Sequence, residues 1–347
     1  MVINNLLPFN KLNNLTMISL KNILSIILLA SGVNAIGQTP EKSKHLPIID
    51  VHVHTMKINP NFTSEMCPWF LSNMPGGDPN EKMQFRASGD CANPLKPAKS
   101  DAEMQAAVLE TMERLNMTMV AFSDAEILHK WYNAAPKGRI IPGIGVSSPK
   151  EMTVESFRDS LSNGFYKVMS EVAPQYQGMS PSDMSLDAYF AVAEELNIPV
   201  GIHMGTGGNG MANITQPKYR ASMGNPLLLE DLLARHPKMK IWVQHAGYPM
   251  IDELIALMGA NAYVYCDISG FIWSYPLDEI HAYIKRLVQA GFGKRIMYGT
   301  DFMMWPKLFE TSIGVIENAQ YLSFDQKRDI LFNNAVRFFR LDEKQFK

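Results

Sequence analysis

The stretch PIIDVHVHT, Pro47–Thr55, is a short apolar run that carries two histidines near its end. A run of this length and composition predicts a buried strand. Because side chains alternate faces along a strand, His52 and His54 would point the same way, in step with Asp50. Two imidazoles that converge from one strand end form a natural pair of metal ligands, although a solvated pair of histidines would fit the same pattern. The remainder of the chain decides between these interpretations.

Further apolar runs follow the first and alternate with stretches whose apolar residues recur at helical spacing. The predicted strands cover residues 46–54, 117–123, 139–146, 164–171, 198–204, 239–246, 262–269 and 294–301. Helices are predicted over residues 101–116, 186–197, 226–237, 277–291 and 324–341, with Asp101 as the N-cap of the first. Eight strands that alternate with helices predict a parallel sheet closed into a single (β/α)₈ TIM barrel. The competing doubly wound sheet usually has a Gly-rich phosphate turn after its first strand, where this chain has His-x-His.

Two segments are too long for ordinary connections between a strand and its helix. Residues 55–100 follow the first predicted strand, and residues 205–224 follow the fifth. Both begin at the carboxyl end of a strand, which is the active-site face of a barrel, so we expect a lid and a substrate loop. Cys67 and Cys91 lie in the first segment. In an oxidising compartment they could form a disulfide, and two free thiols are the alternative.

The N-terminal sequence predicts export from the cytoplasm. Residues 17–35, MISLKNILSIILLASGVNA, combine a lysine, an apolar run and a small-residue pattern that ends at Ala35, which is typical of a secretory signal peptide. We expect residues 1–35 to be removed, with Met17 as an alternative start, and residues 36–347 to form a periplasmic or secreted domain. The apolar run is too short to span a bilayer, so no stable membrane anchor is expected.

Charge and composition limit the classes of partner. The 347 residues have a formal net charge of −2, with Lys and Arg spread along the chain. A basic run, or basic residues interleaved with aromatic ones, would indicate nucleic-acid binding, and we find neither. We therefore expect a small-molecule substrate, and a homo-oligomer remains open.

Five polar side chains lie at or near the carboxyl ends of predicted strands, where the catalytic residues of a barrel gather. They are His52, His54, His203, His245 and Asp301. Three imidazoles and a carboxylate suit Zn²⁺ or a similar divalent ion, with an open position for water. The alternative is that each polar group is satisfied separately in the core. Five such groups at one end of a barrel would be hard to satisfy without an ion, so the pattern favours a metal site.

The motifs DVHVH, GIHMG, VQHAG and YGTD, in this order, resemble the amidohydrolase superfamily. The closest match is the branch of amidohydrolase-related proteins that includes the aminocarboxymuconate-semialdehyde decarboxylase group. The resemblance runs from about Pro47 to Leu341, and the ordered set is more specific than His-x-His alone. It implies that His52, His54, His203 and Asp301 bind the metal, which the donor types lead us to expect to be Zn²⁺. It also implies that His245 is a further ligand or a catalytic imidazole beside the ion.

One position departs from the pattern of the two-metal members of that superfamily. Many of them place a carboxylated lysine, which bridges the ions, at the end of the fourth strand. Here the fourth predicted strand offers Lys167 and Glu171, which would face the same side of a regular strand. Glu171 could bridge a second ion or act on the substrate, and an internal Lys–Glu ion pair is the alternative. We expect one ion, with room for a second.

The residues of the expected site suggest a mechanism. The metal would lower the pKa of a bound water toward neutrality and polarise a substrate carbonyl. Asp301 would take the proton of the water and later deliver it to the leaving group. His245 would donate a hydrogen bond to the developing oxyanion. These roles predict a metal-dependent hydrolase that acts on a lactone, amide or ester bond of a small organic substrate.

Two other functions remain open. The branch that the sequence resembles also contains metal-dependent decarboxylases of aromatic or unsaturated carboxylic acids, which act without oxidation. Such a reaction should need a cation for the acid, and Arg220, in the loop after the fifth strand, could hold it by a two-pronged contact. An exposed, salt-bridging arginine is the alternative at that position. The non-enzyme alternative is a secreted metal-binding barrel.

Aromatic residues near the long loops could form a wall of the substrate site. They are Trp69, Phe70, Tyr248, Trp273 and Trp305, each of which could instead belong to the core. Together with Glu171 and Arg220, Trp273 and Trp305 are the expected substrate contacts.

Overall fold

The computed structural model describes residues 45–61, 63–69, 80, 91–208 and 210–346. The described residues belong to one compact unit. The expected signal peptide, residues 1–35, lies outside the described residues and stays a prediction. Within the described part of the chain, no helix is both long enough and apolar enough to span a membrane.

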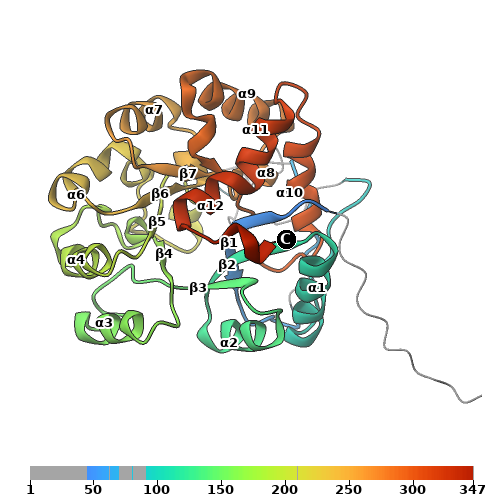
Figure 1. The fold of residues 1–347 in the computed structure, drawn as a ribbon, viewed down its shortest axis with the longest axis horizontal. Helices are drawn as coiled ribbons and strands as arrows, with labels where there is room; N and C mark the ends of the chain where they lie inside the picture. The colour runs from blue at the N-terminus through green and yellow to red at the C-terminus, as the bar shows by residue number, and fades with distance from the viewer. Residues whose placement is uncertain (1–44, 62, 70–79, 81–90, 209, 347) are drawn as a thin grey trace, which may run out of the picture. The chain divides into compact units, whose positions relative to one another are not determined.

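Eight parallel strands form one sheet, and their order in the sheet is their order in the chain (Figure 1). They are β1 (Ile48–Thr55), β2 (Met117–Ser123), β3 (Ile140–Ile144), β4 (Val168–Val172), β5 (Val200–His203), β6 (Ile241–Gln244), β7 (Tyr265–Asp267) and β8 (Ile296–Met297). Backbone hydrogen bonds from Val51 N to Tyr298 O (3.0 Å) and from His54 N to Phe302 O (2.9 Å) join β1 to the segment after β8. The sheet thereby comes round on itself, and the predicted (β/α)₈ barrel is confirmed.

Helices surround the strands (Figure 1). They are α1 (Asp101–Arg114), α2 (Ala125–Ala134), α3 (Val154–Ser162), α4 (Asp187–Glu195), α5 (Met211–Ile214), α6 (Glu230–Arg235), α7 (Ile251–Ala260), α8 (Phe271–Ser274), α9 (Leu277–Leu287), α10 (Leu308–Glu317), α11 (Phe324–Arg328) and α12 (Asn334–Phe339). In α9 the buried residues Ile280, Tyr283, Ile284 and Leu287 recur at the spacing of one helix face. Acidic residues in its first turn and basic residues in its last complement the helix dipole.

The expected N-cap of α1 is off by one residue. Ser100, rather than Asp101, accepts a hydrogen bond from Glu103 N at 3.1 Å, and Asp101 is the first helical residue. The Asp101 carboxylate instead accepts a hydrogen bond from Ile58 N at 2.7 Å. Asp101 therefore ties the start of the long insertion to the helix that follows it.

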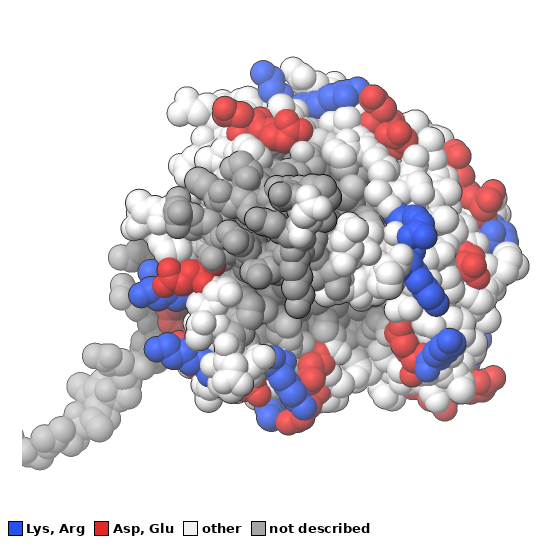
Figure 2. Space-filling view, turned by 180° about the vertical axis from the view of Figure 1, so that it is seen from behind, with Lys and Arg blue, Asp and Glu red and all other residues white. Residues whose placement is uncertain are grey.

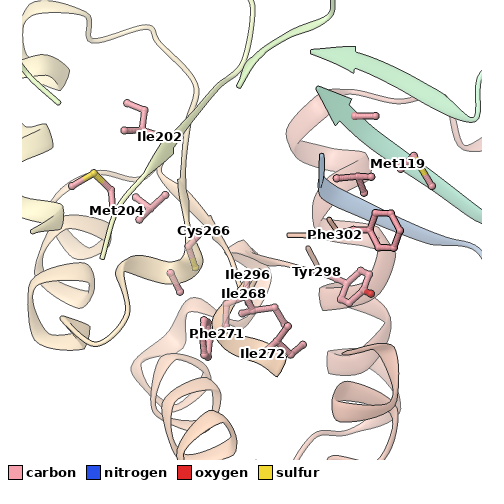
Figure 3. Close-up of a cluster of buried hydrophobic side chains, with 14 of the residues drawn as sticks. Met119, Ile202, Met204, Cys266, Ile268, Phe271, Ile272, Ile296, Tyr298 and Phe302 are labelled. Carbon is pink, nitrogen blue, oxygen red and sulfur yellow. The ribbon is translucent and has the colours of Figure 1, made fainter. Parts of the chain in front are cut away.

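Successive side chains of β2 belong alternately to two parts of the core. Met119 and Ala121 belong to a large cluster shared with the surrounding helices, whereas Val120 and Phe122 belong to a second cluster. Figure 3 shows part of the large cluster around β7, β8 and α8. The second cluster adds apolar residues of other strands to residues of the C-terminal helices, among them Phe338. We infer that it fills the barrel interior, because successive strand residues face opposite sides of the sheet.

The C-terminal helical segment packs on the barrel as expected, but it is not one regular helix. A π-helical turn, Asp329–Asn333, separates α11 from α12. Ser323 and Gln326 form a capping box at the start of α11. The carbonyl of Ile330, within the π turn, accepts a hydrogen bond from Tyr298 N at 2.9 Å, so the irregular turn meets the end of β8 directly.

The described ends of the insertion after β1 are fixed to the carboxyl end of the barrel. A disulfide joins Cys67 to Cys91, which decides between the two alternatives left open by the sequence. Trp69 N donates to Trp273 O at 2.6 Å, and Trp305 Nε1 donates to Ser64 O at 3.1 Å. The insertion is therefore anchored beside the loops that follow β7 and β8, on the face where the site lies.

Candidate metal centre

Six side chains converge at the carboxyl end of the barrel. His52 and His54 come from β1, Glu171 from β4 and His203 from β5. His245 directly follows β6, and Asp301 lies in the segment after β8. A cavity of about 250 Å³ opens between them, and its described lining includes His54, Glu171, His203, His245 and Asp301. His52 lies fully buried beneath this lining. The fold thus brings together all five residues that the strand-end pattern singled out, and adds Glu171.

The first donor group consists of His52, His54 and Asp301. His52 Nε2 lies 3.4 Å from His54 Nε2 and 3.5 Å from Asp301 Oδ1, and His54 Nε2 lies 3.0 Å from Asp301 Oδ1. Two nitrogen ligands of a tetrahedral Zn²⁺, each about 2.0–2.1 Å from the ion, are separated by about 3.3 Å. The spacing of these three atoms therefore fits one shared divalent cation.

The second donor group is built around Glu171. One carboxylate oxygen, Oε1, bonds to His203 Nδ1 and lies 3.2 Å from His245 Nε2, while these two nitrogens are 2.9 Å apart. The other oxygen, Oε2, faces the first group, 3.5 Å from His54 Nε2 and 3.9 Å from His52 Nε2. Glu171 therefore spans both groups, and His52, His54 and Glu171 as well as Glu171, His203 and His245 are close enough to hold an ion.

The charges of the site are strongly coupled. Burial opposes ionisation of Glu171, but His203 and His245 hold its pKa well below the usual value. Burial likewise opposes ionisation of Asp301, yet the hydrogen bond with His54 and nearby imidazoles lower its pKa to about 2. Burial disfavours the charged form of His245, but Glu171 and Asp301 raise its pKa to about 9. Anionic carboxylates and a protonated His245 thus share the cavity of the metal-free protein, an arrangement in which a cation can replace protons.

Two of these residues have a left-handed backbone conformation, and their side chains flank the same glycine. His245 and Asp301 have φ values of 56° and 57°, in the left-handed region that non-glycine residues seldom occupy. Gly270, with φ +69°, passes between them, and a Cβ atom there would lie 2.9 Å from His245 Nδ1 and 3.0 Å from Asp301 Oδ2. Strained residues of this kind cluster at functional sites, where the surrounding structure holds them.

Asp50 supports the site without entering the cavity. It is fully buried, and Oδ1 accepts hydrogen bonds from His52 N and Thr300 N, both at 3.0 Å. Oδ2 accepts a hydrogen bond from Thr300 Oγ1 at 2.7 Å. Burial raises the pKa of Asp50 to about 7. This carboxylate ties the strand that carries both histidines to the segment that carries Asp301.

The structure corrects the expectation for Lys167. The fourth strand begins at Val168, so Lys167 precedes it and is exposed, whereas Glu171 lies near its carboxyl end. At about 3.3 Å per residue, the two positions stand near opposite ends of the strand. The register of β4 is also irregular between Met169 and Val172, so the assumption of regular alternation fails. Lys167 therefore does not reach the donor groups, and the alternative of an internal ion pair between Lys167 and Glu171 is wrong.

Four of the aromatic candidates, Trp69, Tyr248, Trp273 and Trp305, lie outside the described cavity lining, as does Arg220. The guanidinium of exposed Arg220 donates to the carbonyls of Pro217 (3.0 Å) and Tyr219 (2.8 Å). Trp273 Nε1 donates to Thr300 O at 2.6 Å, and its ring lies 6.4 Å from that of Trp305. These tryptophans join loops at the barrel mouth rather than form its described wall.

Two of the remaining aromatic candidates, Tyr248 and Trp69, also contact neighbouring loops. Tyr248 is buried against Phe271 and Tyr275. Trp69 Nε1 donates to Ile272 O at 3.2 Å, which anchors the insertion. Phe70 lies outside the described residues.

Sequence reasoning missed several residues of the site. Tyr176 lines the cavity with its hydroxyl 3.2 Å from His203 Nε2, and Ser123 Oγ lies 2.7 Å from His54 Nδ1. Asp267 and Ser269 are fully buried behind His52 and His245. A polar residue at the end of an apolar strand was the available signal for Ser123 and Asp267, whereas Tyr176 lies in a short 3₁₀ turn with no such pattern.

Comparison with known proteins places the fold in context. A family model described as amidohydrolase matches residues 49–341, nearly all of the described chain. Among curated proteins, the glutamine-hydrolysing GMP synthase of Chromobacterium violaceum is 32% identical over 66 residues, which are 19% of this chain and 12% of that protein. The chain thus matches only a small part of that synthase, and the match carries no argument about activity.

Solved structures share the barrel. An uncharacterised TIM-barrel protein of Bordetella bronchiseptica is 17% identical with a TM-score of 0.59, over 85% of this chain and 99% of that one. A probable 2-pyrone-4,6-dicarboxylic acid hydrolase of Acinetobacter baumannii, with citric acid bound, is 12% identical with a TM-score of 0.55, over 85% and 99%. A 2,6-dihydroxybenzoate decarboxylase from Rhizobium is 14% identical with a TM-score of 0.51, over 86% and 99%. At these identities the likeness concerns the fold alone.

Proposed function

The chain belongs to the amidohydrolase family, and we propose that it is a metal-dependent hydrolase of a lactone, amide or ester bond in a small organic substrate. One observation carries the proposal. His52 Nε2, His54 Nε2 and Asp301 Oδ1, which come from opposite ends of the chain, lie 3.0, 3.4 and 3.5 Å from one another beside the cavity. Such a set of nitrogen and oxygen donors suits a divalent ion such as Zn²⁺.

The residues that would hold the metal follow from the two donor groups. His52, His54 and Asp301 would hold one ion, expected to be Zn²⁺, and His203 is the further ligand implied by the sequence. Glu171, His203 and His245 form a second group that could complete the coordination of this ion or hold another. When bound, a divalent ion polarises a carbonyl and makes a water molecule more acidic.

The protein's own residues supply the proton transfers. Asp301, in the cavity lining and ionised, can accept a proton from an attacking water and return it to the leaving group. His245 has its Nε2 in the same cavity, where Glu171 and Asp301 favour the protonated imidazole, against the effect of burial, in the metal-free protein. It can therefore donate a hydrogen bond to an oxygen that becomes negative during the reaction.

The described lining favours hydrolysis over decarboxylation. It is made of Met211, Gln216, Met303 and Tyr176 beside the acidic and histidine residues, and it includes neither lysine nor arginine. A decarboxylase must orient a carboxylate, for which a bidentate arginine is well suited. Arg220, the expected clamp, donates to its neighbours' carbonyls instead. Decarboxylation of an aromatic or unsaturated acid remains the second candidate, because one of the similar barrels is a decarboxylase.

We also propose that the protein works in the periplasm or outside the cell. The disulfide between Cys67 and Cys91 suits an oxidising compartment. This agrees with the signal peptide expected over residues 1–35. In such a setting the substrate would be a small molecule that reaches the protein by diffusion.

A substrate panel tests the proposal. Metal-loaded protein would be offered lactones, amides, esters and aromatic acids, with ring opening or bond cleavage scored against CO₂ release. Hydrolysis of a lactone, amide or ester, lost in Asp301→Asn, supports the proposal. CO₂ release without any hydrolysis would replace it with the decarboxylase. A metal-loaded protein inactive on the whole panel would favour the non-enzyme alternative, a metal-binding barrel.

A further inference from the structure

A buried acid–hydroxyl pair lies directly behind the cavity and has no part in the mechanism above. Asp267 ends β7, Ser269 follows it, and the side chains of both are fully buried. Ser269 Oγ donates to Asp267 Oδ1 at 2.5 Å. Between them the two side chains contact an imidazole from β1 and one that follows β6.

The Asp267 carboxylate accepts hydrogen bonds on both oxygens. Oδ1 accepts from the backbone nitrogens of His245 (2.9 Å) and Ser269 (3.0 Å), in addition to the Ser269 hydroxyl. Oδ2 accepts from Trp242 Nε1 at 3.1 Å and lies 3.3 Å from His52 Nδ1. Backbone and indole N–H groups can only donate, so the Asp267 carboxylate acts only as an acceptor toward these neighbours.

The hydroxyl of Ser269 determines which ring nitrogen carries the hydrogen in His52 and in His245. Ser269 Oγ lies 3.0 Å from His52 Nδ1 and 3.0 Å from His245 Nδ1. A hydroxyl has one hydrogen, and Asp267 takes it, so only the lone pairs of Oγ remain for the two imidazoles. Both imidazoles must then carry a hydrogen on Nδ1. In His245 the same Nδ1 also lies 3.1 Å from the Ser269 carbonyl oxygen. A carbonyl oxygen can only accept, so this contact likewise requires hydrogen on Nδ1.

We propose that Asp267 and Ser269 are positioning residues that fix His52 and His245 in one tautomer, with hydrogen on Nδ1 and Nε2 directed into the cavity. For His52 this leaves the lone pair of Nε2 facing His54 and Asp301, as a metal ligand requires. For His245 it makes Nε2 the nitrogen that gains and loses a proton. The importance of this for catalysis rests on the proposed function, whereas the tautomers themselves do not.

Nitrogen-15 NMR of histidine-labelled, metal-free protein tests the tautomers without any change at Asp267. The spectra would be recorded near pH 10, and the signals would be assigned by their loss in His52→Gln and His245→Gln. We expect protonated Nδ1 and unprotonated Nε2 in both rings. Hydrogen on Nε2 and none on Nδ1, in either ring, would overturn the proposal. This outcome does not depend on whether the protein binds metal or turns over any substrate.

Asp267→Asn tests the consequence for metal binding. The three donors around Oδ1 would keep the amide oxygen there, which places the amide N–H₂ against His52 Nδ1 and favours hydrogen on Nε2 instead. We expect the affinity for Zn²⁺ alone, titrated into metal-free protein, to fall about 10–100-fold. Ser269→Ala leaves Asp267 Oδ2 facing His52, so its loss should stay below about 10-fold. Asp329→Asn, which changes a buried acid in the π turn that lies beside Lys294 and Arg337, controls for loss of a buried carboxylate.

The two measurements separate the possible failures. A folded Asp267→Asn protein with the Zn²⁺ affinity and ring tautomers of the wild type would overturn the proposal. A wild-type protein that binds no Zn²⁺, yet shows both Nδ1–H tautomers, would contradict the proposed function and still support the positioning role of Asp267 and Ser269. Should Asp267→Asn not fold, the spectrum of the wild-type protein alone decides.

Discussion

Asp301 Oδ1 lies 3.0 Å from His54 Nε2, although His54 belongs to the first strand of the barrel and Asp301 follows the last one. The contact exists because the backbone of the segment after β8 pairs with β1, where Asp301 N donates to His52 O at 2.9 Å. Closure of the barrel and assembly of the donor group are thus one structural event. A change that opens this seam should remove the metal site together with the fold of the mouth.

The first prediction concerns Asp301 as the proton-transfer group. Asp301→Asn keeps the shape of the side chain, but its amide cannot accept the proton of the attacking water. We expect kcat to fall about 10²-fold or more on metal-loaded enzyme. His245→Asn is the comparison, because it should retain the ion and lose the hydrogen bond to the oxyanion. Metal-loaded Asp301→Asn with a near wild-type rate would rule out this mechanism and shift the role of base to Glu171.

A second prediction links Glu171 to the protonation of His245. Burial opposes the charged imidazole, and the hydrogen bond to Glu171 is the largest of the effects that raise its pKa to about 9. Glu171→Gln removes that charge, so in metal-free protein the pKa of His245 should fall toward 6.5. An NMR titration of the ring measures this, with Asp329→Asn as the control. An unchanged pKa would show that Glu171 does not interact with His245 in solution.

The third prediction contrasts the pH dependence of the metal-free and metal-loaded proteins. In the metal-free protein His245 has a folded-state pKa of about 9 against a usual 6.5, and Asp301 raises the pKa of His54 against the opposing effect of burial. A raised pKa stabilises the fold below pH 6.5, and this stability is lost as pH rises through 9. Bound metal requires neutral imidazoles, so its stabilisation grows with pH.

Thermal unfolding between pH 6.5 and 9 measures both trends. The Tm of metal-free protein should decrease across this window, and the increase in Tm caused by saturating Zn²⁺ should become larger. A metal-free Tm that rises with pH across the same window would contradict the assigned ion pairs.

The fourth prediction concerns Arg220 and the choice between reactions. Because its guanidinium is exposed and donates to two nearby carbonyls, Arg220→Ala should change kcat/KM by no more than about twofold, as for most surface substitutions. Steady-state kinetics on the best substrate of the panel provides the test. A higher KM for Arg220→Ala, confined to substrates with a carboxylate, would show that Arg220 binds that group and would favour decarboxylation.

Much of the fold could be predicted because strand and helix periods are local properties of the sequence. The predicted run 117–123 coincides with β2, whereas the run 294–301 is reduced to a two-residue strand, β8. Beyond Met297 the chain still pairs with β1, but Asp301 adopts a left-handed backbone that no apolar pattern signals. The ends of strands were therefore less predictable than their existence.

The ligand-type residues could be predicted for a related reason. His52, His54 and His203 interrupt or end apolar runs, where a polar side chain demands an explanation. The role of Asp267 could not be seen, because it depends on Ser269 and on two imidazoles from distant strands. The position of the Arg220 guanidinium likewise depends on the local path of its loop, which the sequence pattern does not determine.

The central claim is that His52, His54 and Asp301 hold a divalent ion at the barrel mouth. The most direct test is metal analysis of the purified mature protein and of His52→Ala, each after incubation with Zn²⁺ and removal of free ions. We expect at least about one ion per wild-type chain and a near-complete loss in His52→Ala, since each removed ligand weakens such a site strongly. A wild-type stoichiometry near zero, or a value unaffected by His52→Ala, would contradict the claim.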